Sequence, residues 1–164
     1  MTDTTVYNLL LKNLLEELKG FYGSHLVTFA VFGSYARADM RPDSDLDLLI
    51  IAEALPRGRM KRVDEFIKLE KKLAPEFEAL KQKELYPYLA PILKTPEEAK
   101  HGSPLFLDMT EELVLLFDRD DFFKQVLDRL RARLRELGSK RVWKGKMWYW
   151  ILKPDLKPRE IIEI

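Results

Sequence analysis

The amino-acid sequence predicts an α/β protein in which helices and strands alternate along the chain. Residues 26–32 form a short apolar run rich in β-branched and aromatic residues, which is typical of a buried central strand. Residues 45–51 begin with two acids and continue as an apolar run, which predicts a second strand. Residues 4–20 and 60–73 carry apolar residues at helical spacing, which predicts amphipathic helices.

The first predicted helix packs on the core. Thr4 or Thr5 can cap its start, and Gly20 lies beyond its end. Its apolar residues fall on one stripe, formed by Val6, Leu10, Leu11, Leu14, Leu15 and Leu18.

The middle of the chain predicts a third strand and two further helices. Residues 84–93 are strand-like, but Pro87 and Pro91 remove two backbone donors, so the strand is expected at an edge or to be irregular. The sequence of residues 95–98, Thr-Pro-Glu-Glu, contains a cap, a first-turn proline and a capping-box acid. Residues 103–116 are predicted as another helix because Ser-Pro opens them.

A turn that suits phosphates follows the first predicted strand. Gly33 can turn the backbone sharply at the strand end and approach a ligand closely. Ser34 to Arg37 can then open a short helix, so that free amides, the Ser34 hydroxyl and the Arg37 guanidinium suit a triphosphate. Taken alone, Gly-Ser after a strand is also typical of an ordinary tight turn.

Two acids begin the second predicted strand. Asp45 and Asp47 are two residues apart, so both side chains leave one face of the strand while Leu46 enters the core. Carboxylates this close repel each other unless a cation joins them. Hard oxygen ligands beside a phosphate favour Mg²⁺. An isolated Asp-x-Asp is typical of a solvated strand edge, but here only ten residues separate Ser34 from Asp45.

These residues together resemble a known family. Phe32-Gly33-Ser34, ten intervening residues and then Asp45-Leu46-Asp47-Leu48 are similar to the signature of the polymerase-beta-type nucleotidyltransferase superfamily, and most similar to its minimal nucleotidyltransferases. The resemblance implies a mixed β-sheet flanked by helices. It also implies an enzyme that binds ATP or another nucleoside triphosphate. Such an enzyme transfers the nucleoside monophosphate to a hydroxyl and releases pyrophosphate. By position in the motif, Gly33 and Ser34 would bind the terminal phosphates, and catalytic Mg²⁺ would be bound by Asp45 and Asp47. Arg37 would support the phosphate turn and Ser44 would orient Asp45, which completes the set of nucleotide-binding residues.

The sequence departs from the family pattern at two positions. Ala38 follows the arginine of the turn where a glycine is common, a change expected to cost little. Family members also use a third acid on a later strand to bind metal and assist deprotonation of the acceptor hydroxyl. Glu84 is the only acid of the predicted strand 84–93 and lies at its entry end. It is therefore the candidate third metal ligand, and the alternative is a solvated strand-end acid.

The last third of the chain is basic and aromatic. Residues 1–118 are predicted as the nucleotidyltransferase domain, and residues 119–164 as a C-terminal extension packed on it, made of a basic helix over 119–138 and an aromatic β-hairpin. Between Arg129 and Lys146 eight cations stand against one acid, a pattern that can bind a polynucleotide. The favoured alternative is a solvated helix face followed by a hairpin whose Trp148 and Trp150 pack on the body.

Composition predicts a cytoplasmic, heat-adapted protein. The chain has no cysteine, which fits an intracellular protein. It also has no apolar run of membrane-spanning length, so no membrane association is expected. It is 34% charged, with four amide residues in 164, a balance typical of thermophilic proteins.

Two classes of function follow from the sequence. The favoured one is an Mg²⁺-dependent nucleotidyltransferase that acts on RNA, a protein hydroxyl or a small molecule. The alternative is a weakly catalytic or non-catalytic module of the same fold that acts through a protein partner, such as an antitoxin of a toxin pair. The acidic pair favours the enzyme, because two adjacent acids are costly without a metal. A homodimer stays open, since the aromatic tail can close a core or form an interface.

Overall fold

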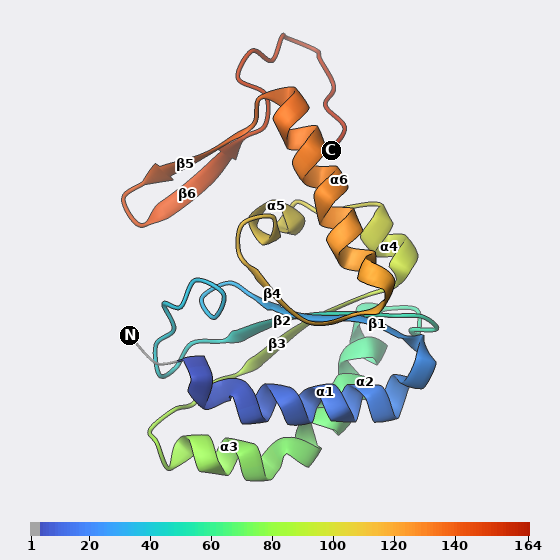
Figure 1. Cartoon of the computed structure of the whole chain (residues 1–164), viewed down its shortest axis with the longest axis vertical. Coiled ribbons are helices and arrows are strands. Elements are labelled where there is room, and N and C mark those ends of the chain that lie inside the picture. Colours follow the sequence, from blue (N-terminus) through green and yellow to red (C-terminus); the bar gives the residue numbers. More distant parts are fainter. Residues whose placement is uncertain (1–3) are drawn as a thin grey trace.

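The computed structural model describes residues 4–164 and contains a four-stranded mixed sheet (Figure 1). The strand order is β3-β2-β1-β4. β1 is antiparallel to both β2 and β4, whereas β2 and β3 are parallel. The strands span Leu26–Phe32 (β1), Leu46–Ala52 (β2), Leu89–Lys94 (β3) and Leu113–Asp118 (β4). The predicted mixed sheet flanked by helices is confirmed.

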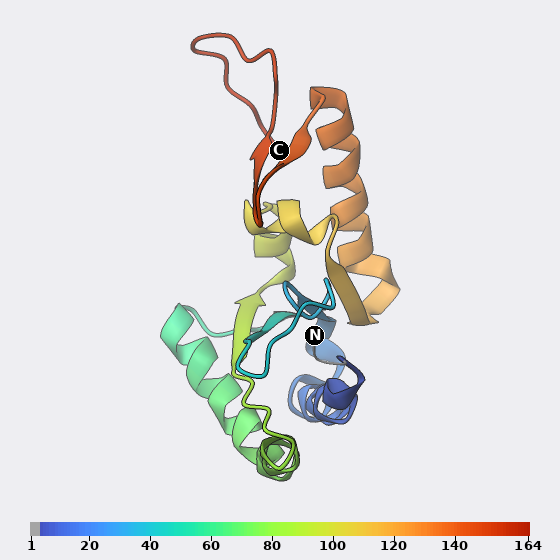
Figure 2. The same ribbon diagram turned by 90° about the vertical axis from the view of Figure 1, so that its left-hand side faces the viewer.

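Helices cover both faces of this sheet (Figures 1 and 2). One face is covered by α1 (Asn8–Tyr22), α2 (Arg59–Glu70) and α3 (Ala74–Lys81), and the other by α4 (Pro96–Lys100), α5 (Leu105–Met109) and α6 (Phe122–Leu137). Short 3₁₀ helices span Thr4–Tyr7, Gly23–His25, Lys71–Leu73 and Arg119–Asp121. No helix within residues 4–164 is both long enough and apolar enough to span a bilayer.

The two central strands are apolar on both faces because both faces are covered. All seven residues of β1 are buried, and in β2 only Asp47 is half-buried. Leu48 and Ile50 pack with α1 in one core, whereas Leu49 and Ile51 pack with α6 in the other. Burial of each such side chain contributes about 1.5–3 kcal/mol. Asp47 lies two residues before Leu49, so its carboxylate lies on the same α6 face, near the start of the strand.

The predicted stripe of the first helix is confirmed. Leu10, Leu11, Leu14 and Leu18 are buried, and Val6 and Leu15 pack against the same core.

The predicted cap at residues 95–98 is confirmed as well. The Thr95 hydroxyl accepts a hydrogen bond from the Glu98 amide at 3.2 Å, and the Glu98 carboxylate accepts one from the Thr95 amide at 2.9 Å. Two bonds from Arg62 to the same carboxylate lower the pKa of Glu98 to about 2.

The predicted helix over 103–116 is wrong. The helix α5 ends at Met109, and residues from Leu113 onward form β4, which pairs with β1 along its length. Ser-Pro does open a helical turn, but the apolar run that follows completes the hydrogen bonds of a central strand. Tertiary pairing with β1 therefore decides the structure of this run, for which the Ser-Pro start alone predicts a helix.

The chain ends in a helix and a hairpin, as predicted. Gly138 ends α6 with a φ of +69°, and the hairpin consists of β5 (Lys140–Lys144) and β6 (Met147–Ile151). Phe123, Val126 and Leu127 of α6 are buried in the second core. The hairpin stands on the α6 side of the sheet, next to the loop that joins β1 to β2 (Figures 1 and 2). The proposed division of the chain at residue 118 stays a prediction.

Candidate active site

The turn after β1 lies directly against Asp47. Phe32 pairs with Asp47 across β1 and β2, and Gly33 follows with a φ of +67°. A Cβ atom added to Gly33 would stand 2.3 Å from Oδ2 of Asp47, which no real side chain tolerates. Glycine is therefore required for two reasons, its left-handed backbone and the close approach of the carboxylate. The phosphate-sized turn and the acidic strand meet at this point.

The turn is a single hydrogen-bonded loop. The Arg37 amide donates to the Gly33 carbonyl at 3.1 Å, and the Asp39 amide donates to the Ser34 carbonyl at 3.0 Å. Residues 33–38 form turns, so the predicted short helix from Ser34 to Arg37 is not formed. The bonds nevertheless curl the backbone as a helix start does, and they keep Ser34 beside the acids.

The two acids and one cation form an electrostatic cluster. Asp45 is exposed and lies one residue before β2, whereas Asp47 is half-buried. Burial raises the pKa of Asp47, the Asp45 charge raises it further, and the Arg37 charge lowers it. Within residues 4–164, neither carboxylate accepts a hydrogen bond or forms an ion pair. Two repelling oxygen donors with free lone pairs fit a hard divalent cation.

Ser44 closes the loop that leads into the acids. Its hydroxyl accepts a hydrogen bond from the Arg41 amide at 2.9 Å, and its own amide donates to the Arg41 carbonyl at 3.0 Å. The serine therefore fixes the backbone immediately before Asp45. Its placement suits the predicted orienting role, exerted through the backbone.

Glu84 does not join the acidic pair. It lies in a turn with a φ of +58°, and its amide donates to the Lys81 carbonyl at 2.9 Å. The strand β3 begins only at Leu89, beyond Pro87, so the predicted strand over 84–93 starts five residues too early. Within the described chain, no group of three or more His, Cys, Asp or Glu side chains is arranged to hold a metal. Ala90 is the parallel partner of Asp47 on β3.

Four residues at the edge of the site were not assigned to it from the sequence. Glu112 accepts a hydrogen bond from Nη1 of Arg37 at 2.8 Å and also binds Arg141 of β5. Trp148 lies over the Arg37 guanidinium, and its indole N–H donates to Asp108 of α5.

The expectation that Trp148 and Trp150 pack on the body is confirmed, because both indoles donate to the same oxygen of Asp108, at 2.7 and 2.9 Å. Alternation of the two tryptophans on one strand was the available sequence signal.

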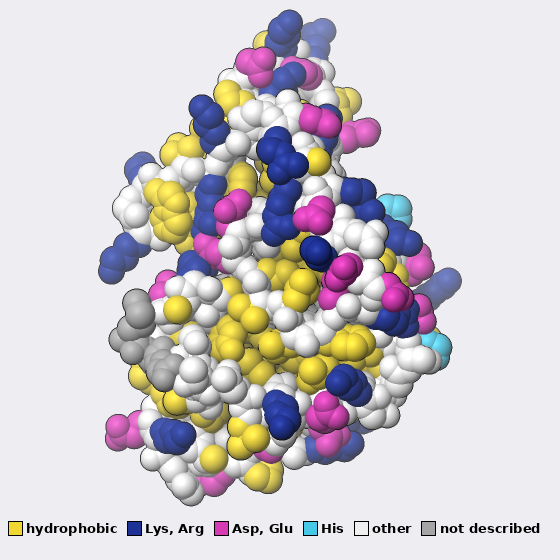
Figure 3. Space-filling model, viewed as in Figure 1, with side chains coloured by type: hydrophobic (Ala, Val, Ile, Leu, Met, Phe, Trp, Pro, Cys, Tyr) yellow, Lys and Arg dark blue, Asp and Glu magenta, His cyan; other side chains and the backbone are white. Residues whose placement is uncertain are grey.

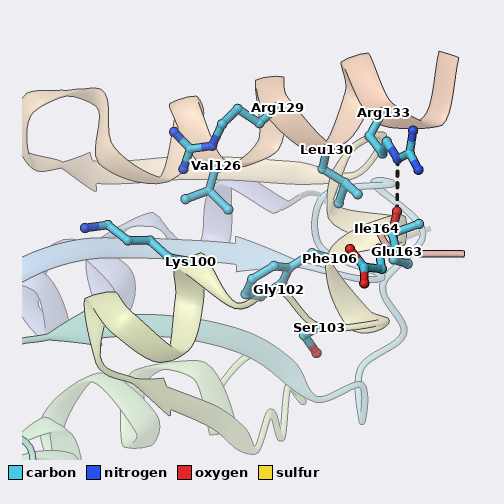
Figure 4. Close-up of a pocket in the computed structure, with 10 residues that line it drawn as sticks. All are labelled: Lys100, Gly102, Ser103, Phe106, Val126, Arg129, Leu130, Arg133, Glu163 and Ile164. Carbon is cyan, nitrogen blue, oxygen red and sulfur yellow. Dashed lines mark hydrogen bonds between the residues drawn. The ribbon is translucent and has the colours of Figure 1, made fainter. Parts of the chain in front are cut away.

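The basic stretch of α6 is partly neutralised by local partners. Arg131 donates to the Thr110 carbonyl and pairs with Asp128, and Arg133 donates to the Glu163 carbonyl and pairs with Glu136. Arg129 and Arg133 line a pocket of about 400 Å³ with Lys100 and the C-terminal residues (Figure 4). Neither the residues of the phosphate turn nor Asp45 and Asp47 line this pocket. Binding of nucleic acid along Arg129–Lys146 stays an untested prediction, and it is the less favoured of the two interpretations of this stretch.

Ala38 is strained, contrary to the expected small cost of the change. Its φ is +56°, in the left-handed region where an L-residue costs about 1–2 kcal/mol. We expect Ala38→Gly to raise the free energy of unfolding by about 0.5–1 kcal/mol, after the larger chain entropy of glycine is subtracted. Urea unfolding measures the change. Ala36→Gly is the matched control and is expected to destabilise by about 0.5–1 kcal/mol, because Ala36 has a negative φ. A loss of stability in Ala38→Gly would contradict the strain.

Comparisons with known proteins show the family of this chain. Residues 11–103, more than half of the chain, match the sequence model of the nucleotidyltransferase domain family. A protein of Methanocaldococcus jannaschii, named "Putative protein adenylyltransferase MJ1305", is 30% identical over 151 residues, which are 89% of this chain and 95% of that protein. Among solved structures, a toxin-antitoxin complex with AMP-PNP is 17% identical over 77% of this chain and 91% of that chain, with a TM-score of 0.43. The MntA-HepT toxin-antitoxin structure is 15% identical over 79% of this chain and 92% of that chain, with a TM-score of 0.42. The chain belongs to the nucleotidyltransferase domain family and is a transferase enzyme.

Proposed function

We propose that the protein transfers AMP from ATP to a hydroxyl of a protein substrate, with Mg²⁺ as cofactor. The observation that carries the proposal is the close approach of Gly33, which has no side chain, to the Asp47 carboxylate. This approach places the phosphate turn next to the acids. The name of the M. jannaschii relative supports ATP as donor and a protein as acceptor. Asp45 and Asp47 would hold the metal, and substrate phosphates and water would complete its coordination.

The chemistry is a substitution at the α-phosphorus. The acceptor oxygen forms a bond to this phosphorus, the bond to the bridging oxygen of pyrophosphate breaks, and the hydroxyl proton leaves to solvent. When bound, Mg²⁺ would neutralise charge on the phosphates and favour deprotonation of the attacking oxygen. The amides and hydroxyl of the Gly33–Ser34 turn would bind the terminal phosphates, and the Arg37 guanidinium would add charge-assisted hydrogen bonds. Most of the contribution of the chain is thus positioning.

Thermal unfolding with each of the four ribonucleoside triphosphates, with and without Mg²⁺, tests the donor and the metal. ATP with Mg²⁺ at about 100 times its dissociation constant is expected to stabilise the fold by roughly 2.7 kcal/mol, a rise in Tm of about 5–10 °C. The Asp45→Asn/Asp47→Asn double variant should lose this rise. Asp43→Asn, a charge change in the same loop, should keep it. The donor assignment fails if another triphosphate stabilises more than ATP does.

The acceptor is tested with ATP labelled at the α-phosphate. Label transferred to protein survives ribonuclease and is lost after protease treatment, whereas label on RNA behaves in the opposite way. Label found only on RNA would overturn the protein acceptor.

One observation favours a second candidate, a weakly catalytic module that acts through a protein partner. Among the described residues, no third acid joins Asp45 and Asp47, and Ala90 occupies the neighbouring position of β3. This candidate predicts that no triphosphate stabilises the fold, even at millimolar concentration.

A further inference from the structure

The β5–β6 hairpin contacts the phosphate turn through a stacked guanidinium. The central carbon of the Arg37 guanidinium lies 5.0 Å from the centroid of the Trp148 ring. A cation at this distance from an indole face is attracted to it. The hairpin stands out from the body (Figures 1 and 3). A segment beyond residue 103, where the family match ends, thus covers one side of the turn.

Glu112 connects the same guanidinium to the hairpin a second time. Its carboxylate, only 11% exposed, accepts a hydrogen bond from Arg37 at 2.8 Å and one from Nη2 of Arg141. Arg141 in turn lies 4.8 Å from the Trp143 ring centroid and 4.3 Å from that of Trp148. One carboxylate, two guanidinium groups and two indoles therefore form a continuous stack beside the turn.

The hairpin is also anchored to the body at a second point, Asp108 of α5. The indole N–H groups of Trp148 and Trp150 donate to the same Oδ1 of Asp108, at 2.7 and 2.9 Å. Hydrogen bonds to a carboxylate are stronger than those between neutral groups. Asp108 thus fixes the distance between the hairpin and α5, and with it the position of the Trp148 ring above Arg37.

Arg37 retains donors that the stack does not use. Its Nε donates to Asp39 at 3.2 Å and its Nη1 to Glu112, whereas no hydrogen bond within residues 4–164 uses Nη2. A guanidinium presents five N–H donors in a rigid plane, so fixing two of its nitrogens also fixes the direction of the remaining N–H groups. Arg37 belongs to the turn that stands against Asp47, because its amide donates to the carbonyl of Gly33, the residue that closely approaches the Asp47 carboxylate.

We propose that the β5–β6 hairpin is a wall of the triphosphate site, in which Trp148, Glu112 and Arg141 are positioning residues that hold the Arg37 guanidinium toward the phosphates. This inference rests on the proposed function, because it assumes that the turn binds a nucleoside triphosphate. Through Arg37, the hairpin would help to bind the polyphosphate part of the nucleotide. The hairpin therefore acts on affinity for the nucleotide.

A pair of tryptophan variants tests the inference by calorimetric titration of the whole chain with Mg²⁺-ATP. Trp148→Leu and Trp150→Leu each remove one indole and one hydrogen bond to Asp108, but only Trp148 contacts Arg37. We expect Trp148→Leu to weaken binding about tenfold, as loss of a partly buried cation–π contact does, and Trp150→Leu to change it less than about twofold. Trp148→Phe, which keeps an aromatic face, should remain within about threefold of the wild type.

Each result has a defined meaning. Equal affinity of Trp148→Leu and the wild type overturns the inference. Equal weakening by Trp148→Leu and Trp150→Leu also overturns it, because the effect then comes from the shared Asp108 anchor. If the wild-type protein does not bind Mg²⁺-ATP at all, the proposed function has failed and the contacts of the hairpin are structural. Circular dichroism and Tm values of the variants show whether each is folded at the titration temperature.

Discussion

Replacing Gly33 by alanine is expected to abolish triphosphate binding and to lower the free energy of unfolding by about 2–4 kcal/mol. Two costs combine at this position. The φ of +67° puts the new side chain in the left-handed region, which costs about 1–2 kcal/mol. The added Cβ would also stand 2.3 Å from Oδ2 of Asp47, so the turn must move away from the carboxylate. Urea unfolding and titration with Mg²⁺-ATP measure the two effects.

Gly138→Ala separates the two costs. Gly138 has a φ of +69°, but its added Cβ would meet only Cδ of Pro154 at 3.9 Å, an ordinary contact. We expect this control to lose about 1 kcal/mol, the backbone cost alone, and to bind ATP as the wild type does. Equal losses of stability in the two variants, with ATP binding kept, would contradict a tight contact between the turn and the acid.

The central part of the fold was predictable because its signals are local. The buried run of β1, the stripe of α1 and the capping box at Thr95 each depend on residues close in sequence. The link between Gly33 and Asp47 was predictable for a related reason. Only ten residues separate Ser34 from Asp45, so two adjacent strands suffice to bring the turn and the acids together.

The remaining features depend on contacts between distant residues. The run from Leu113 to Asp118 has no local property that separates a strand from a helix, and its pairing with β1 decides the outcome. Glu112 lies 75 residues from Arg37 and 29 from Arg141, so their shared hydrogen bonds could not be read from spacing. The positive φ of Ala38 and of Glu84 is likewise set by the loops around them, against the preference of both residue types.

Asp47→Asn is expected to change stability and activity in opposite directions. Burial and the neighbouring Asp45 raise the pKa of Asp47 above its ordinary value of 3.8, although Arg37 opposes them. The native state then holds the proton more tightly than the unfolded state. Without metal, stability therefore falls as pH rises from about 3.8 through the raised pKa, and the full cost of ionisation is present above it.

Asparagine removes this cost, so the metal-free variant should be more stable than the wild type at pH 7, and the advantage should vanish below pH 3.8. The rate of nucleotidyl transfer should fall at least about 10³-fold. Loss of the metal ligand removes several kcal/mol of transition-state stabilisation, and each 1.36 kcal/mol corresponds to about a factor of ten in rate. Urea unfolding with a chelator at both pH values measures the first effect, and release of labelled pyrophosphate measures the second.

Asp43→Asn is the control, and it should leave both stability and activity near the wild type because this exposed acid lies outside the cluster. A metal-free Asp47→Asn protein less stable than the wild type would mean that the carboxylate supports the fold through its own contacts. The opposite result would identify a carboxylate that destabilises the chain by itself. A cation bound between Asp45 and Asp47 would remove that repulsion, so the same acids would stabilise the fold only when metal and nucleotide are present.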